Sequence, residues 1–193
     1  NFLQYAARTF IPRLPNWRGG LPDPAHITFQ DFKHLTGIDL VVAGTNLSQR
    51  RSQLFSASNT PDFPVVEAIG ISSCFPVAFK PVWVFDSMTD VNGRSLEGYW
   101  IDGGFLNNLP LKAFGDQRRI GPGTLAFKLN SGAPQSAPIA YPTDRPGAAL
   151  ANFALDMYET AFSITGQGNL LTEEEISQTI EIFSYSLSLF EFS

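Results

Sequence analysis

Short apolar runs alternate with helical segments along this chain, and that alternation constrains its fold more than any other feature. Runs rich in β-branched and aromatic residues predict strands, whereas apolar residues at spacings of three and four predict helices. We predict strands at 38–44, 53–56, 82–85, 99–101, 124–129 and 179–187, and helices at 28–36, 64–69 and 150–161. Strands that alternate with helices indicate an α/β sheet rather than an all-α or all-β fold.

The helix that begins after Thr28 has the clearest local signals. The Thr28 hydroxyl can cap the first turn, and Asp31 occupies the reciprocal position of a capping box. Gly37 suits the left-handed residue that ends a helix. A second acidic start, at 172–175, predicts either another helix start or a solvated turn, and the Ser-, Pro- and Gly-rich stretch 131–147 predicts a loop.

Residues 1–27 mix aromatic residues with Pro and Gly, and we predict irregular structure there after a helix end. We expect the aromatic side chains of Phe2, Tyr5, Phe10 and Trp17 to lie in the core, because most large aromatic residues are buried.

Composition excludes several classes of function. The net charge is −5 and the pI is near 4.9, so a nucleic-acid partner, which needs a concentrated basic footprint, is not expected. One cysteine, Cys74, leaves no internal disulfide, and with two histidines the chain has too few soft ligands for a zinc site. We therefore expect no metal. We also expect no membrane-spanning helix, because no apolar stretch is long enough.

The segment from Trp100 to Pro110 carries the strongest candidate for chemistry. An aromatic strand runs directly into Asp102, Gly103 and Gly104, so a rigid strand end would aim the carboxylate. The two glycines remove side-chain bulk, which would let a substrate or a second catalytic group approach. Asp-Gly is also a common turn without any chemistry, and that interpretation stays open on this motif alone.

A second segment, 68–82, contains Ser72 and Ser73 between Gly70 and Pro76. We interpret it as a packing element, with a serine nucleophile as the alternative. It does not fit the Gly-x-Ser-x-Gly elbow, because its last position is Cys74, and that pattern occurs nowhere in the 193 residues.

The histidines restrict the kind of active site. In α/β hydrolases the triad runs Ser, acid, His along the chain, yet His26 and His34 both precede Asp102 and none follows it. A Ser–His–Asp triad is therefore disfavoured. A serine–aspartate dyad, in which the carboxylate acts as the base, remains compatible.

Three segments taken in order resemble patatin-like phospholipases. They are Gly44-Thr45-Asn46-Leu47 at a strand end, the serine block from Ser72 to Pro76 with Phe79 and Pro81 behind it, and Asp102-Gly103-Gly104 with the trailing Asn107 and Pro110. The resemblance is specific over about residues 28–130 and looser elsewhere. Gly44 departs from the family's usual residue before Thr45.

This resemblance implies an α/β patatin-like three-layer sandwich around a mainly parallel sheet, of which residues 1–193 form the C-terminal portion of a single catalytic domain. It implies a lipid acyl hydrolase of phospholipase A type, with Asp102 as the base of the dyad. Gly103, Gly104, Ser73, Pro76 and Asn107 would support the motifs. The serine elbow and the glycine-rich oxyanion turn are expected upstream of Asn1.

No cofactor is implied by the resemblance. The expected partners are a phospholipid or other acyl lipid, a membrane surface contacted peripherally and the N-terminal part of the same protein. With such a substrate, the alternative to a core position for the aromatic residues near the start (Phe2, Tyr5, Phe10, Trp17) is an acyl-chain channel or a surface that contacts a lipid interface. We expect a cytoplasmic or peripheral membrane location, with a secreted effector as the alternative. The rival to the enzyme is a catalytically incomplete domain that binds lipid or a protein partner.

Overall fold

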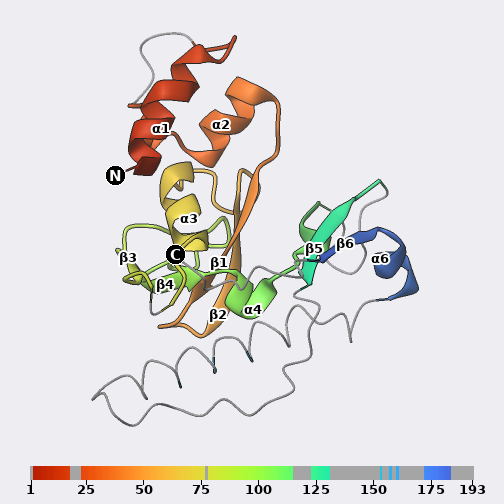
Figure 1. The fold of residues 1–193 in the computed structure, drawn as a ribbon. Coiled ribbons are helices and arrows are strands. Elements are labelled where there is room, and N and C mark those ends of the chain that lie inside the picture. The colour runs from red at the N-terminus through yellow and green to blue at the C-terminus, as the bar shows by residue number, and fades with distance from the viewer. Residues whose placement is uncertain are drawn as a thin grey trace. The chain divides into compact units, whose positions relative to one another are not determined.

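A computed structural model of the chain describes residues 2–17, 23–76, 78–114, 123–130, 153, 157, 160 and 172–183. The chain divides into two compact units, Asn1–Asn108 and Leu109–Ser193, and each is described by itself. Both contain helices and strands, so the expected α/β class is confirmed (Figure 1).

The first unit contains the candidate site. Its helical elements are α1 (Phe2–Phe10), η1 (Ile11–Arg13), η2 (Pro24–His26), α2 (Phe29–Thr36), α3 (Val65–Ser72) and α4 (Gly104–Asn107). Its strands are β1 (Val41–Asn46), β2 (Arg51–Ser56), β3 (Val82–Val84) and β4 (Gly98–Asp102). They form one four-stranded sheet in the order β2-β1-β4-β3, which places β4 beside β1 although β2, α3 and β3 separate them in sequence.

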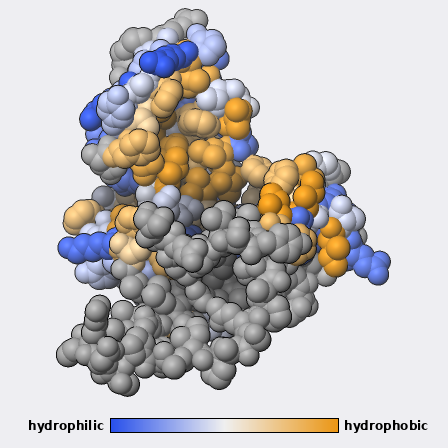
Figure 2. Space-filling model, viewed as in Figure 1, coloured by the Kyte–Doolittle hydropathy of each residue, from blue (hydrophilic) through white to orange (hydrophobic). Residues whose placement is uncertain are grey.

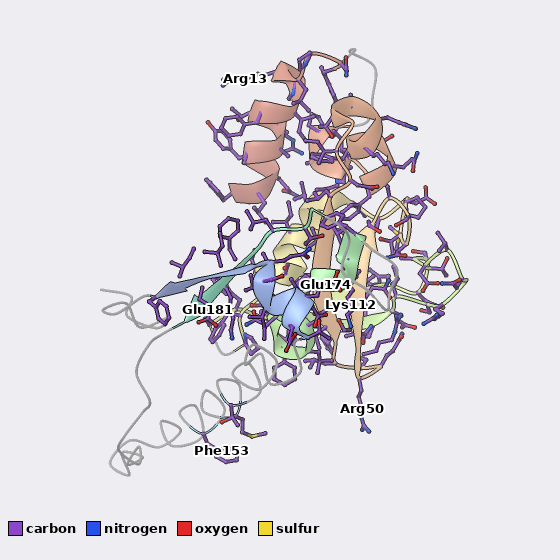
Figure 3. The ribbon with its side chains drawn as sticks, turned by 90° about the vertical axis from the view of Figure 1, so that its right-hand side faces the viewer. Arg13, Arg50, Lys112, Phe153, Glu174 and Glu181 are labelled. Carbon is purple, nitrogen blue, oxygen red and sulfur yellow. The ribbon has the colours of Figure 1, made fainter. Side chains whose placement is uncertain are left out.

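All three pairings of this sheet are antiparallel, so the expectation of a mainly parallel sheet is wrong for these strands. For the pair of β1 and β2 the physical reason is their short connection, which consists of residues 47–50 alone. Parallel neighbours need a crossover of about a dozen residues or more, whereas a turn of this length permits only a hairpin. Arg50 ends the turn with φ of 55° and extends away from the sheet (Figure 3).

The core lies between α3 and one face of the sheet. Trp100 of β4 is fully buried there and packs against Phe55 at a ring-centroid distance of 5.0 Å. The indole N–H donates to the Leu96 carbonyl oxygen at 2.8 Å, which satisfies its polar group inside the core. The buried members of this cluster are Phe29, Phe55, Phe63, Val65, Ala68, Ile71, Val84, Leu96 and Trp100.

Local signals in the sequence correctly predicted α2 and α3. Both hydrogen bonds of the capping box join Thr28 and Asp31, and Gly37 ends α2 with φ of 70°. Pro64 occupies the N-cap position of α3, where a residue without an N–H loses no helical hydrogen bond.

The irregular structure predicted for residues 1–27 is wrong at its beginning, because Phe2–Phe10 form the regular helix α1. The prolines that suggested irregularity begin only at Pro12, after the helix has ended. The expected burial is also wrong for Phe2, Tyr5 and Phe10, which are exposed, whereas Trp17 is half-buried. Figure 2 shows that apolar residues are exposed on the drawn face of the described part of the chain.

In the second unit, β5 (Ala126–Asn130) and β6 (Thr179–Phe183) form a parallel pair. The helix η3 (Leu111–Phe114) comes before β5, and α6 (Glu173–Ser177) comes before β6. The parallel arrangement expected from the sequence is thus present in this pair. Of the two alternatives predicted for 172–175, the helix start is confirmed. Thr172 and Glu175 form a capping box of α6, and their hydrogen bonds lower the pKa of the Glu175 carboxyl. The predicted loop at 131–147, most of the helix at 150–161 and residues 184–187 lie outside the described residues.

Candidate functional site

Asp102 is the last residue of β4 and lies opposite Gly44 of β1. Its side chain is half-buried, and its Oδ1 accepts a hydrogen bond from the Gly104 N–H at 2.9 Å. This contact is a short Asx-type turn, which fixes the carboxylate to the backbone that follows it. The carboxylate therefore has a defined orientation at a strand end, as the sequence predicted.

Gly103 lies tightly against β1. A Cβ atom at this position would stand 2.4 Å from both the carbonyl carbon and the carbonyl oxygen of Ala43. With φ of −64° and ψ of −27°, the backbone of Gly103 is one that any residue adopts, so space and not conformation requires the glycine. We had expected the missing bulk to admit a substrate or a catalytic group, but at Gly103 it admits strand β1.

Gly104 and Asn107 bound the short helix α4 that follows. Gly104 is buried and supplies the N–H that holds Asp102, while the Asn107 N–H donates to the Gly103 carbonyl oxygen at 2.8 Å. Both residues therefore help to hold the turn that carries the carboxylate. The side chain of Asn107 is half-buried.

The serine block reaches Asp102 through a backbone hydrogen bond. The Asp102 N–H points away from β1 and donates to the Cys74 carbonyl oxygen at 3.0 Å. The pairing of β4 with β3 stops at Trp100, which lies opposite Val82. At Asp102, the segment that follows α3 accepts the hydrogen bond in place of β3. Two motifs that are 28 positions apart (74 and 102) thus meet at the candidate base.

Cys74 itself is buried, and its Sγ donates to the Lys80 carbonyl oxygen at 3.1 Å. Burial raises the pKa of the Cys74 thiol, the hydrogen bond from Val82 opposes this, and the negative charge of Asp102 raises it further. A buried thiol with a raised pKa is a poor nucleophile at neutral pH. Sequence reasoning did not associate Cys74 with the site, and no sequence signal marks it, because the contact uses a backbone carbonyl that every residue has.

Ser73 has a structural role. Its hydroxyl donates to the Ile69 carbonyl oxygen at 2.8 Å, at the C-terminal end of α3, and the side chain is exposed. This bond supports the packing interpretation over a nucleophile at Ser73. Ser72 and Pro76 are half-buried on either side of this turn.

The two histidines make local contacts. His26 lies 3.9 Å from Asp23 in the η2 region, and His34 contacts Gln30 one turn earlier on α2. Both side chains are exposed. The geometry therefore gives no support to a triad containing either histidine.

Asn46 is a buried polar residue whose role the sequence did not reveal. Its Nδ2 donates to the Glu97 carbonyl oxygen at 3.1 Å, and its Oδ1 accepts from the Gln49 N–H at 2.9 Å. Asn46 therefore joins the β1–β2 turn to the beginning of β4. In the segment that resembles the family, this residue supports the strand that carries Asp102.

Within the described part of the chain, no three His, Cys, Asp or Glu side chains gather as they would to hold a metal ion. Over the same residues, no helix combines the length and apolar character needed to cross a bilayer.

A protein-family model described as patatin-like phospholipase matches residues 3–114, more than half of the chain. The chain belongs to the patatin-like phospholipase family. It is also 27% identical over 85 residues to the probable lipid hydrolase 463L of Invertebrate iridescent virus 6. That match covers 44% of this chain and 26% of the viral protein, so the chain aligns with about a quarter of its relative's length. The matched residues 3–114 include all three segments that resemble the family in sequence.

Proposed function

We propose that this protein hydrolyses acyl ester bonds of phospholipids or related lipids, with Asp102 as the base of a serine–aspartate dyad. The observation that carries the proposal is the fixed carboxylate at the end of β4, held by Gly104 on its side chain and by Cys74 on its backbone. Family membership and the lipid hydrolase name of the viral relative support the substrate class.

The proposal assigns the nucleophile to a serine outside the 193 residues, in a Gly-x-Ser-x-Gly elbow. The serine oxygen bonds to the ester carbonyl carbon while Asp102 takes the hydroxyl proton, and the alcohol leaves with that proton. Water then attacks the acyl carbon, gives its proton to Asp102 and releases the fatty acid as the serine regains its proton. Backbone amides of an upstream glycine turn would hold the oxyanion.

Three further parts of the proposal concern context. Residues 1–193 form the C-terminal portion of a single catalytic domain, and that domain is completed to a three-layer sandwich. The protein acts peripherally at a membrane surface. Asp102, Gly103, Gly104, Ser73, Pro76 and Asn107 form the motif residues, with proton transfer assigned to Asp102 alone.

The substitution Asp102→Asn in the full-length natural protein tests the proposal. Asn keeps an oxygen that can accept the Gly104 hydrogen bond but cannot act as a base, so we expect ester hydrolysis to fall at least about 10²–10⁴-fold with folding unchanged. Asp39→Asn is the matched control, because Asp39 is an exposed carboxylate that pairs with Lys33 at 2.7 Å on the surface. Release of fatty acid from phosphatidylcholine and from a soluble short-chain ester measures the activity.

A fluorophosphonate probe tests the other half of the dyad. We expect the full-length protein to gain one phosphonyl group at a serine outside residues 1–193, as measured by intact and peptide mass spectrometry. Retained hydrolysis in Asp102→Asn contradicts the dyad. Absence of both labelling and hydrolysis in the wild type favours the catalytically incomplete domain that binds lipid or a protein partner.

A further inference from the structure

Three aromatic side chains, one on β3, one on β4 and one directly after β3, lie together on the outside of the first unit. Trp83, Phe85 and Tyr99 are 40%, 72% and 52% exposed. Trp83 pairs directly with Tyr99 across the two strands, with ring centroids 4.7 Å apart and planes at 70°. The Phe85 ring meets Trp83 edge-on at 6.5 Å. These three residues are called the β3–β4 aromatic surface below.

The rings contact one another, so the surface is ordered before anything binds to it. Edge-to-face aromatic pairs are favourable and hold each ring in place. β3 is an edge strand of the sheet, which leaves this surface at the border of the unit.

This location is opposite the core. Side chains alternate along a strand, and Val84 and Trp100 point into the buried cluster next to α3. Trp83 and Tyr99 are one residue away from these and therefore point out of the other face. A partner that contacts these rings does so without disturbing the core that supports β4.

The charges near the surface identify the kind of partner. Strand β3 itself carries no charged side chain, and the charges that flank the rings in sequence, Lys80, Asp86 and Glu97, are of both signs with an acidic excess. The chain as a whole is acidic, with a net charge of −5, so attraction to an anionic surface does not account for this area. Trp and Tyr rings, with an apolar body and one polar atom, are the side chains that favour the boundary between lipid and water.

We propose that the β3–β4 aromatic surface docks the protein on the interface of a zwitterionic lipid membrane. The proposal rests on the proposed function, because a lipid hydrolase must reach its substrate at such an interface. Tyr99 and Asp102 are three residues apart on one strand, which is about 10 Å. Their side chains leave opposite faces of the sheet, so docking through Tyr99 leaves the carboxylate uncovered.

Binding of the full-length protein to phosphatidylcholine vesicles, measured by flotation, tests the proposal. We expect the triple variant Trp83→Ser/Phe85→Ser/Tyr99→Ser to bind roughly tenfold more weakly or worse, because each lost ring removes apolar surface from the interface. The matched control is Phe2→Ser/Tyr5→Ser/Phe10→Ser, which removes three exposed aromatics from α1 and should bind as the wild type does. Added salt should have little effect, because no charge pairing is involved.

Two gentler measurements keep the test valid where the triple variant fails to fold. Phe85→Ser changes only the most exposed ring of the three and should still weaken vesicle binding measurably. Vesicles of brominated phosphatidylcholine should quench the fluorescence of the wild type, and Trp83→Phe should bind but lose most of that quenching. The quenching that Trp83→Phe retains reports on the half-buried Trp17 and the buried Trp100, which are the other two tryptophans of the 193 residues.

Hydrolysis of a soluble short-chain ester separates the two proposals. Normal hydrolysis of that ester by the triple variant, together with lost vesicle binding, supports the docking surface. Wild-type vesicle binding by the triple variant overturns it, as does binding by the wild type to anionic vesicles alone. Unchanged binding by Phe85→Ser together with unchanged quenching in Trp83→Phe also overturns it. If the wild type hydrolyses no ester but its vesicle binding still depends on these rings, the docking surface stands and the proposed function fails.

Discussion

Replacing Gly103 with alanine should destabilise the protein for a steric reason that can be isolated. The new Cβ would stand 2.4 Å from two backbone atoms of Ala43 and 2.6 Å from its Cβ. Ordinary contacts of this kind begin at about 3.4 Å, so β1 and β4 would have to separate by about 1 Å where Gly44 pairs with Asp102. Strain from such overpacking is typically 1–3 kcal/mol.

Gly70→Ala is the matched control, because it makes the same change in a position with room. Gly70 lies inside α3, and a Cβ there would meet only Leu3 Cδ1 at 3.9 Å. In a helix interior Ala is favoured over Gly by about 0.5–1 kcal/mol, so this variant should be more stable than the wild type. Gly103 also has helical φ and ψ, so the backbone preference alone predicts the same gain for Gly103→Ala.

Urea unfolding followed by far-UV circular dichroism measures both variants. We expect the midpoint to fall for Gly103→Ala and to rise for Gly70→Ala, a difference in free energy of unfolding of about 1–3 kcal/mol between them, because the backbone gain is common to both variants. Thermal unfolding should show the same order, at about 2–4 °C for each kcal/mol. A Gly103→Ala midpoint equal to that of Gly70→Ala would refute the close approach of β1.

Two further predictions concern single polar groups. Thr45 is 1% exposed, and within the described residues its Oγ1 has no hydrogen-bond partner. Thr45→Val should therefore raise the free energy of unfolding by about 1 kcal/mol, and a decrease of about 1 kcal/mol in urea unfolding would contradict this. Hydrogen bonds from Arg8 and the Ala25 N–H lower the pKa of the Asp23 carboxyl to about 2. The stability that this pair contributes is present above the unfolded-state pKa of about 3.9 and is lost as the pH falls through about 2. Arg8→Gln should therefore unfold at lower urea than the wild type at pH ~6, and the two midpoints should converge near pH ~2; a difference independent of pH would contradict this.

Local chemistry made much of the first unit predictable. The capping box of Thr28 and Asp31 acts within one turn, so it determines where α2 begins whatever surrounds it. Strand positions were less well predicted, since β1 runs from Val41 to Asn46 rather than over 38–44. The directions of the strands were predicted wrongly, because the expectation came from the family as a whole and not from the four-residue turn that joins β1 to β2.

The candidate site was predictable only as far as one residue determines it. A strand that ends in Asp102 and two glycines indicated an aimed carboxylate, and that is what β4 presents. The contact with Cys74 was not predictable, because a carbonyl oxygen from another element makes it and carbonyls have no sequence signature. The exposure of the α1 aromatics was equally hidden, since an aromatic residue on a helix looks the same in sequence whether a core or an interface receives it.

Most of the motif residues support the architecture, and this affects how mutations in them should be interpreted. Gly103 makes room for β1, Asn46 joins a turn to β4, and Ser73 bonds to the end of α3, so loss of any of them would move the strand that carries Asp102. Activity lost in such variants is therefore no evidence that the residue takes part in the reaction. Asp102→Asn differs, because its side chain keeps the shape and an oxygen for the Gly104 bond while losing the ability to accept a proton. A loss of hydrolysis in Asp102→Asn without a change in the unfolding midpoint is thus evidence that Asp102 takes part in the reaction. The same loss with a lower midpoint is evidence only that the residue stabilises the structure.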